Sequence, residues 1–264
     1  MYYNLIKRSV ERFKSANLLD DLKFRKVSES KEAIEEILRT ILNDEKLVVL
    51  EVLKQSTEEE PLFHGVILDC KCILVTEEIV NIEIQVSHND NPLYRMRYNG
   101  SMLTIENSPK KKNYKYSEIP HLILIMFCEF DIFDIDKPIY EIVRYVKDTD
   151  IIADDGVREL YVNLKSKVTD KYLKSLFRIM TTVNDVDKKL FPKLSMIKEN
   201  INKLYIGGED NMNGVLLEAY KDGVEEGIEQ GIEQGIEKGK NDLLHELIEK
   251  GIITNEQVEK LSKE

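Results

Sequence analysis

The sequence lacks any long uninterrupted apolar run. Hydrophobic residues make up 42% and charged residues 33% of its 264 residues, and no stretch approaches the roughly 18 uncharged apolar residues of a membrane-spanning helix. The opening segment, MYYNLIKRSVERF, has Lys7, Arg8, Glu11 and Arg12 where a secretory signal would be apolar. We therefore expect a soluble protein with no membrane association and a cytoplasmic location.

Cysteine is scarce, and the number of cysteines is odd. Cys70, Cys72 and Cys128 all lie within apolar, β-like segments, a distribution that does not suggest a disulfide framework. Cys70 and Cys72 could form half of a zinc site, but no second cysteine pair or histidine cluster accompanies them. We predict three buried, reduced thiols.

Basic residues are fewer than acidic residues. The chain has 38 Lys and Arg residues against 49 Asp and Glu residues, which gives a formal net charge of -11. Because phosphate binding depends mainly on Lys and Arg, the whole surface is not suited to nucleic acid. Any contact with nucleic acid must come from a local basic patch.

The length fits one α/β domain with an appendage, since single cores usually stop growing near roughly 250 to 300 residues. We predict a domain at 1–208 and a helical tail at 209–264. Apolar residues at three- and four-residue intervals predict a helix at 28–42, with Ser30 placed to cap it. The other expected elements are a β-rich run at 47–53, a helix at 92–106, a buried strand at 121–130, strands at 139–146 and 158–164, and two helices within 170–206, the second containing Pro192.

A glycine repeat distinguishes the tail. From Gly223 to Gly239 glycine occupies every fourth position, in the segment GVEEGIEQGIEQGIEKG. Each glycine costs a helix about 1 kcal/mol relative to alanine, so the period has little value for an isolated helix. It indicates close approach to another backbone, and we expect a homo-oligomer formed through this helix or docking on the body. A mobile, solvated acidic helix is the alternative.

Two strand-like segments, VILDCKCILV at 66–75 and IVNIEIQV at 79–86, are separated by a short turn and predict a β-hairpin. Because side chains alternate along a strand, Asp69 lies on the polar face of the first strand, and Glu83 and Gln85 share the polar face of the second. Folding places them within the roughly 4.5 to 8 Å reach of cross-strand neighbours. We expect the three side chains to converge in one pocket.

A carboxylate pair in such a pocket suits hydrolysis of a phosphodiester. The reaction needs an activated water and neutralisation of developing negative charge, and Mg²⁺ held by two carboxylates serves both needs. Asp69 and Glu83 would supply this pair. The alternative is that polar side chains on one face of the hairpin merely face solvent.

The order of motifs resembles the PD-(D/E)XK nuclease family transposases, also called recombination-promoting nucleases. The similarity covers roughly residues 20 to 250, and the order is more specific than any one motif. The matching segments are DDLKFRKV (20–27), LDCKC, NIEIQ, RMRYNGSM (95–102), IMFCEFDIFDIDKPIYEIVR (125–144) and the glycine repeat.

The resemblance implies a restriction-endonuclease-like α/β fold, in which helices flank a mixed β-sheet. It also implies DNA cleavage that depends on Mg²⁺, with Mn²⁺ as a substitute, in recombination, mobile elements or phage defence. By matching positions, Asp69 and Glu83 bind the metal, Asp21 adds a remote ligand, and Gln85 occupies the place of a lysine in the broader superfamily. Glutamine brings no positive charge and cannot act as a base, so we expect slower chemistry.

Candidate DNA contacts lie downstream of the hairpin. Arg95 and Arg97 on the following helix would reach backbone phosphates, and Lys110, Lys111 and Lys112 form a basic loop. For Arg95 the alternative is a structural salt bridge to an active-site carboxylate. For the lysines it is a solvated run of charge.

Two other functions remain open. In the first, Gln85 marks weakened or absent catalysis, and the chain is a DNA-binding or protein-interaction module that uses its helical tail. In the second, the helices between Leu243 and Leu261 belong to a DNA-binding regulator. The second is weaker, because that segment is short and has few basic residues on any one face.

Overall fold

The computed structural model describes residues 13–53, 69–88, 91–111 and 113–203, together with the single positions 235, 239 and 250. The chain divides into two units, 1–207 and 208–264, and the elements named below all belong to the first. Apart from Gly235 and Gly239, the glycine repeat lies outside the described residues, as does the terminal helix pair. The repeat helix and the oligomer expected from it stay predictions. No helix in the described ranges is long and apolar enough to cross a membrane.

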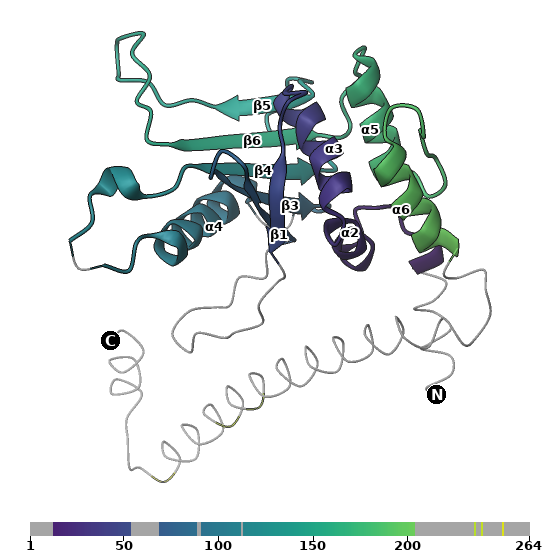
Figure 1. Cartoon of the computed structure of the whole chain (residues 1–264), viewed down its shortest axis with the longest axis horizontal. Helices are drawn as coiled ribbons and strands as arrows, with labels where there is room; N and C mark the ends of the chain where they lie inside the picture. Colours follow the sequence, from purple (N-terminus) through teal and green to yellow (C-terminus); the bar gives the residue numbers. More distant parts are fainter. Residues whose placement is uncertain are drawn as a thin grey trace. The chain divides into compact units, whose positions relative to one another are not determined.

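A six-stranded mixed sheet forms the centre of the first unit (Figure 1). Its strand order is β1-β2-β3-β4-β6-β5; the β3–β4 and β4–β6 pairs are parallel, and the others are antiparallel. The strands are β1 Val49–Leu53, β2 Cys70–Leu74, β3 Ile79–Gln85, β4 Leu122–Cys128, β5 Ile139–Ile142 and β6 Val157–Asn163. With the helices that flank it, this sheet confirms the predicted restriction-endonuclease-like α/β fold.

Helices bury the sheet. The apolar residues Met96 and Leu103 of α4 join a core cluster with alternate residues of β4, including Leu124 and Met126. The intervening residues of β4 are buried as well, and the remaining helices pack against one another as a separate group (Figure 1). The helices are α2 Asp21–Ser28, α3 Lys31–Leu42, α4 Pro92–Asn107, α5 Lys171–Thr181 and α6 Pro192–Lys203, with a short 3₁₀ helix, η1, at Tyr116–Glu118.

Side-chain caps set the starts of three helices. Ser30 Oγ accepts the N–H of Ala33 at 3.3 Å, as predicted, and α3 begins at the next residue. Asn91 caps α4 through the N–H of Leu93 at 3.0 Å, and Asp170 caps α5. These short polar side chains satisfy N–H groups that have no partner inside the helix.

The predicted extents of two elements were wrong. Residues 139–146 form a strand only as far as Ile142, and beyond it Tyr145 makes an isolated antiparallel bridge with Ile152. Pro192 does not lie inside a helix but is the first residue of α6. A proline has no N–H to lose there, because the first N–H groups of a helix have no partner within it.

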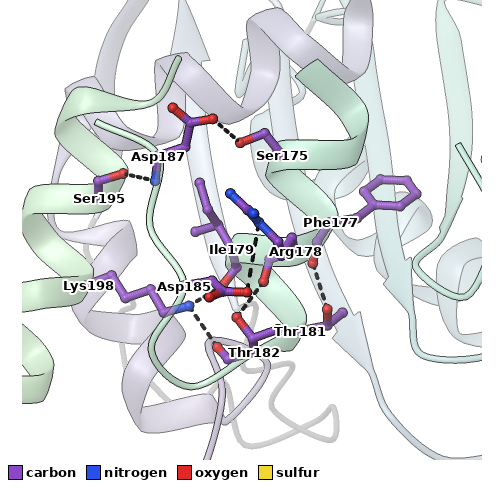
Figure 2. Close-up of polar contacts among 10 residues, drawn as sticks. All are labelled: Ser175, Phe177, Arg178, Ile179, Thr181, Thr182, Asp185, Asp187, Ser195 and Lys198. Carbon is purple, nitrogen blue, oxygen red and sulfur yellow. Dashed lines mark hydrogen bonds and ion pairs between the residues drawn. The ribbon is translucent and has the colours of Figure 1, made fainter. Parts of the chain in front are cut away.

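A buried lysine ties α6 to the end of α5 (Figure 2). The ammonium of Lys198 donates to the carbonyl oxygens of Ile179 at 2.5 Å and Thr182 at 2.7 Å. Both carbonyls lie at the C-terminal end of α5, where the helix dipole favours a positive charge. Nearby, the hydroxyl of Ser175 donates to the carboxylate of Asp187 at 2.8 Å, which links α5 to the chain just before α6.

Candidate functional site

The β2–β3 hairpin places Asp69 beside Glu83. Cys70 pairs with Ile82 in antiparallel register, so Asp69, one residue earlier, comes next to Glu83, one residue later. The carboxylate of Asp69 accepts the backbone N–H of Ile84 at 2.6 Å, which holds it against β3. The structure thus brings the two predicted carboxylates together.

The polar face of β3 is buried beneath α4. Glu83 is 0% exposed, and its neighbours on that face, Asn81 and Gln85, are buried too. Glu83 accepts hydrogen bonds on both oxygens: Oε1 from Asn81 Nδ2 at 3.0 Å, and Oε2 from the Arg95 guanidinium at 2.7 Å. The interpretation that these side chains merely face solvent is therefore wrong, whereas the salt bridge considered for Arg95 is present.

The negative charges of the two carboxylates repel each other. Burial, and next the negative charge of Glu83, raise the pKa of Asp69 from 3.8 to about 7; Asp21 adds to the rise, and Arg95 opposes it. Burial likewise raises the pKa of Glu83, against the lowering effects of Asn81 and Arg95. A cation close to the pair would favour the ionised form of both groups.

The raised pKa of Asp69 predicts how stability depends on pH. The carboxyl group of Asp69 holds its proton more tightly in the folded protein than in the unfolded chain. Proton binding by Asp69 therefore contributes fully to the free energy of unfolding below about pH 4, and this contribution is lost as the pH rises to about 7. In buffer containing EDTA, we compare the melting temperatures of Asp69→Asn and the natural protein. The melting temperature of the variant minus that of the natural protein should increase as the pH rises through this window. A difference between the two melting temperatures that is independent of pH would contradict the raised pKa.

The other predicted site residues lie at the margins of the pair. Gln85 ends β3, and its amide nitrogen donates to the carbonyl of Ser87 at 3.1 Å. Asp21 is the first residue of α2 and acts on Asp69 through its charge. Within the described ranges no group of three or more His, Cys, Asp or Glu side chains is arranged to hold a metal ion. The role of Asp21 as a remote ligand stays a prediction.

The predicted basic residues are dispersed. The guanidinium of Arg97 lies over the ring of Tyr94, 5.3 Å from its centroid. Lys110 is exposed, Lys111 forms an ion pair with Glu118, and Lys112 lies outside the described residues. Of the predicted DNA contacts that the structure describes, only Arg95 has a direct contact with the carboxylate pair.

Two buried amides had no predicted role: Asn81 on β3, the strand of Glu83, and Asn99 on α4, the helix of Arg95. Asn81 Oδ1 and Asn99 Nδ2 are both buried and make no hydrogen bond within the part of the chain that the structure describes. Spacing is the signal for them in the sequence: Asn81 precedes Glu83 by two strand positions, and Asn99 follows Arg95 by about one helical turn. Both therefore share a face with a site residue.

Burial sets the state of the three cysteines in the described part of the chain. Cys70, Cys72 and Cys128 are free and buried, as predicted. Burial raises the pKa of the Cys72 thiol to about 12 and that of Cys70 well above its usual value. Because the thiolate is the reactive form, the burial of these thiols disfavours nucleophilic attack at neutral pH.

Comparison of the sequence with known protein families gives a match. Residues 19–200 match the profile of the PD-(D/E)XK nuclease family transposases. This segment runs from just before α2 into α6, so it contains the whole sheet and the Asp69–Glu83 pair. Comparison with curated proteins and with solved structures finds no significant match. Because the matched segment is well over half of the chain, this protein belongs to the PD-(D/E)XK nuclease family transposases.

Proposed function

We propose that this protein is a DNA endonuclease that depends on a divalent metal ion held by Asp69 and Glu83. Its family implies a nuclease that acts on DNA. The observation that carries the finer assignment is the buried carboxylate pair on adjacent strands, with Asp69 held by a backbone N–H and Glu83 held by Asn81 and Arg95. DNA of mobile elements, recombination intermediates or phage in the cytoplasm would be the substrate.

The donor set fits Mg²⁺. This ion prefers oxygen ligands and usually binds proteins through one or two carboxylates together with waters and substrate phosphates, so the Asp69–Glu83 pair is sufficient. The pKa of Asp69 is raised first by burial and next by the negative charge of Glu83, and a cation bound beside the pair would stabilise the ionised carboxylate. When bound, the ion would activate a water and neutralise charge on the phosphate. Mn²⁺ takes the same ligands and should substitute.

The residues of the chain orient the reacting groups. The N–H of Ile84 and the amide of Asn81 fix the two carboxylates before substrate arrives, and such preorganisation lowers the barrier to a charged transition state. Gln85 can donate a hydrogen bond to a water or phosphate oxygen but cannot remove a proton. We therefore propose an active but slow nuclease.

Cleavage of supercoiled plasmid DNA tests the proposal. The purified protein should nick and then linearise the plasmid with Mg²⁺ or Mn²⁺, and EDTA should abolish cleavage. Asp69→Asn, purified in parallel, should leave the plasmid intact, because a neutral amide cannot replace the carboxylate that binds the metal. Equal cutting by both proteins would identify a contaminating nuclease and contradict the assignment.

A binding role on the same fold is the second candidate. Asn81 and Arg95 both donate to Glu83, at 3.0 and 2.7 Å, and these contacts compete with a metal ion for the same oxygens. This arrangement favours weak chemistry. A protein that binds DNA in Ca²⁺ but does not cut it in Mg²⁺ or Mn²⁺ would favour the binding role.

A further inference from the structure

The proposed reaction needs a positive charge that Gln85 does not supply. Phosphodiester hydrolysis gathers negative charge on the phosphate oxygens, and placed cations or donors stabilise it. Lys71 on β2 is already engaged by Glu106 at 2.9 Å and Asn107 at 3.3 Å, at the C-terminal end of α4. Within the described ranges, Arg95 is the cation in direct contact with the carboxylate pair.

The start of α4 aims Arg95 at the site. Asn91 caps the helix and its carbonyl accepts the N–H of Arg95 at 3.1 Å, so Arg95 lies in the first turn. The side chain of Arg95 is 32% exposed, whereas that of Glu83 is 0% exposed. Arg95 thus contacts the buried carboxylate with a side chain that is itself partly open to solvent, from which DNA must approach.

Close packing of α4 fixes the depth of Arg95. A Cβ atom at Gly100 would lie 2.7 Å from Cδ1 of Leu124, so a residue without a side chain allows the helix to approach β4. Met96, the residue after Arg95, is fully buried in the core beneath the helix. Arg95 is thus anchored on a rigid element, which is the support that an accurate catalytic group requires.

The chemistry of the guanidinium suits a second partner. It has five N–H donors in a planar fork that matches phosphate and carboxylate oxygens. The contact with Glu83 Oε2 engages one of the two terminal nitrogens. The same side chain can therefore hold Glu83 and donate to a phosphate oxygen next to it.

We propose that Arg95 is a catalytic residue that supplies, from α4, the positive charge missing at Gln85, by donating to the scissile phosphate. This inference rests on the proposed nuclease function. It predicts that the site depends on a cation between the C-terminal end of β3 and the N-terminal end of α4. It also predicts that a lysine placed at position 85 can replace the guanidinium. A purely structural Arg95 would not be replaceable in this way.

A four-protein comparison tests the inference: the natural protein, Arg95→Gln, Gln85→Lys, and Arg95→Gln combined with Gln85→Lys. Arg158→Gln is the matched control, because Arg158 also forms an ion pair with a glutamate, Glu141 at 2.9 Å, but both side chains are close to half exposed. Two quantities are measured: the rate of plasmid cleavage in Mg²⁺, and the affinity for a short DNA duplex in Ca²⁺ by fluorescence anisotropy. The second quantity does not depend on cleavage.

Arg95→Gln should cut about 10²-fold more slowly, as expected for the loss of one donor to a charged transition state, and Arg158→Gln should stay close to the natural rate. The double variant should recover at least about tenfold over Arg95→Gln, with DNA affinity following the same order. Cleavage by Arg95→Gln at the natural rate, or no recovery in a folded double variant, would overturn the inference.

Failure of the proposed function gives a different result. If the natural protein does not cut DNA, the nuclease assignment fails and the DNA affinities test Arg95 on their own. A loss of affinity in Arg95→Gln that Gln85→Lys restores supports a contact between Arg95 and a phosphate. Equal affinities of all the proteins overturn that contact. Arg95→Lys covers the case in which Arg95→Gln does not fold, because it retains the charge beside Glu83. It should cut about tenfold more slowly, since the fork of donors is lost, and an unchanged rate would overturn the inference.

Discussion

Replacing Glu83 with glutamine is expected to slow metal-dependent DNA cleavage by about 10³-fold or more. Glutamine retains the size of the side chain and an oxygen that Arg95 can bond, but it removes the charge that binds the metal ion. A metal ion stabilises such a transition state by several kcal/mol, and each 1.36 kcal/mol corresponds to a tenfold change in rate. Initial rates of plasmid cleavage at saturating Mg²⁺ measure the effect.

Glu106→Gln is the matched control for this change. Glu106 is also a carboxylate in an ion pair, with Lys71 at 2.9 Å, but it is exposed at the C-terminal end of α4. More than half of the Glu106 side chain is exposed, so solvent screens its pair with Lys71, and cleavage should remain near the natural rate. Calorimetric titration with Mn²⁺ should show binding by the control and none by Glu83→Gln. If Glu83→Gln cleaves DNA at the natural rate while Asp69→Asn is inactive, Glu83 is not a ligand of the metal ion.

Replacing Phe127 with alanine is expected to lower the free energy of unfolding by about 3–5 kcal/mol, the usual cost of removing a buried aromatic ring. Phe127 is 0% exposed at the middle of the sheet, where β4 pairs it with Ile84 on one side and Val162 on the other. Domains are usually stable by about 5–15 kcal/mol, so the variant should melt far below the natural protein. Urea denaturation followed by circular dichroism measures the difference.

Ile105→Ala is the control for packing. Ile105 lies on α4 but is 68% exposed, and surface substitutions usually change stability by less than about 0.5 kcal/mol. A loss of stability in Phe127→Ala no larger than that of Ile105→Ala would show that the centre of β4 is not the stabilising core of the sheet.

The elements with a clear period could be predicted from the sequence. The apolar stripe from Ala33 to Ile41 gave α3, and Ser30 marked its start. The continuous apolar run gave β4, which lies between two parallel neighbours. The end of β5 was not predicted, because the apolar pattern continues past Ile142 while pairing with β6 stops there and Tyr145 bridges to Ile152 instead.

The sequence alone also identified Asp69 and Glu83 as a pair, because a short turn between two alternating strands leaves few possible registers. It could not decide what covers them. Burial of Glu83, its contact with Arg95 and the close approach at Gly100 all depend on α4 packing on that face. Alternation is a local property of a strand, whereas the burial of a face depends on which distant segment packs against it, and only the tertiary structure decides that.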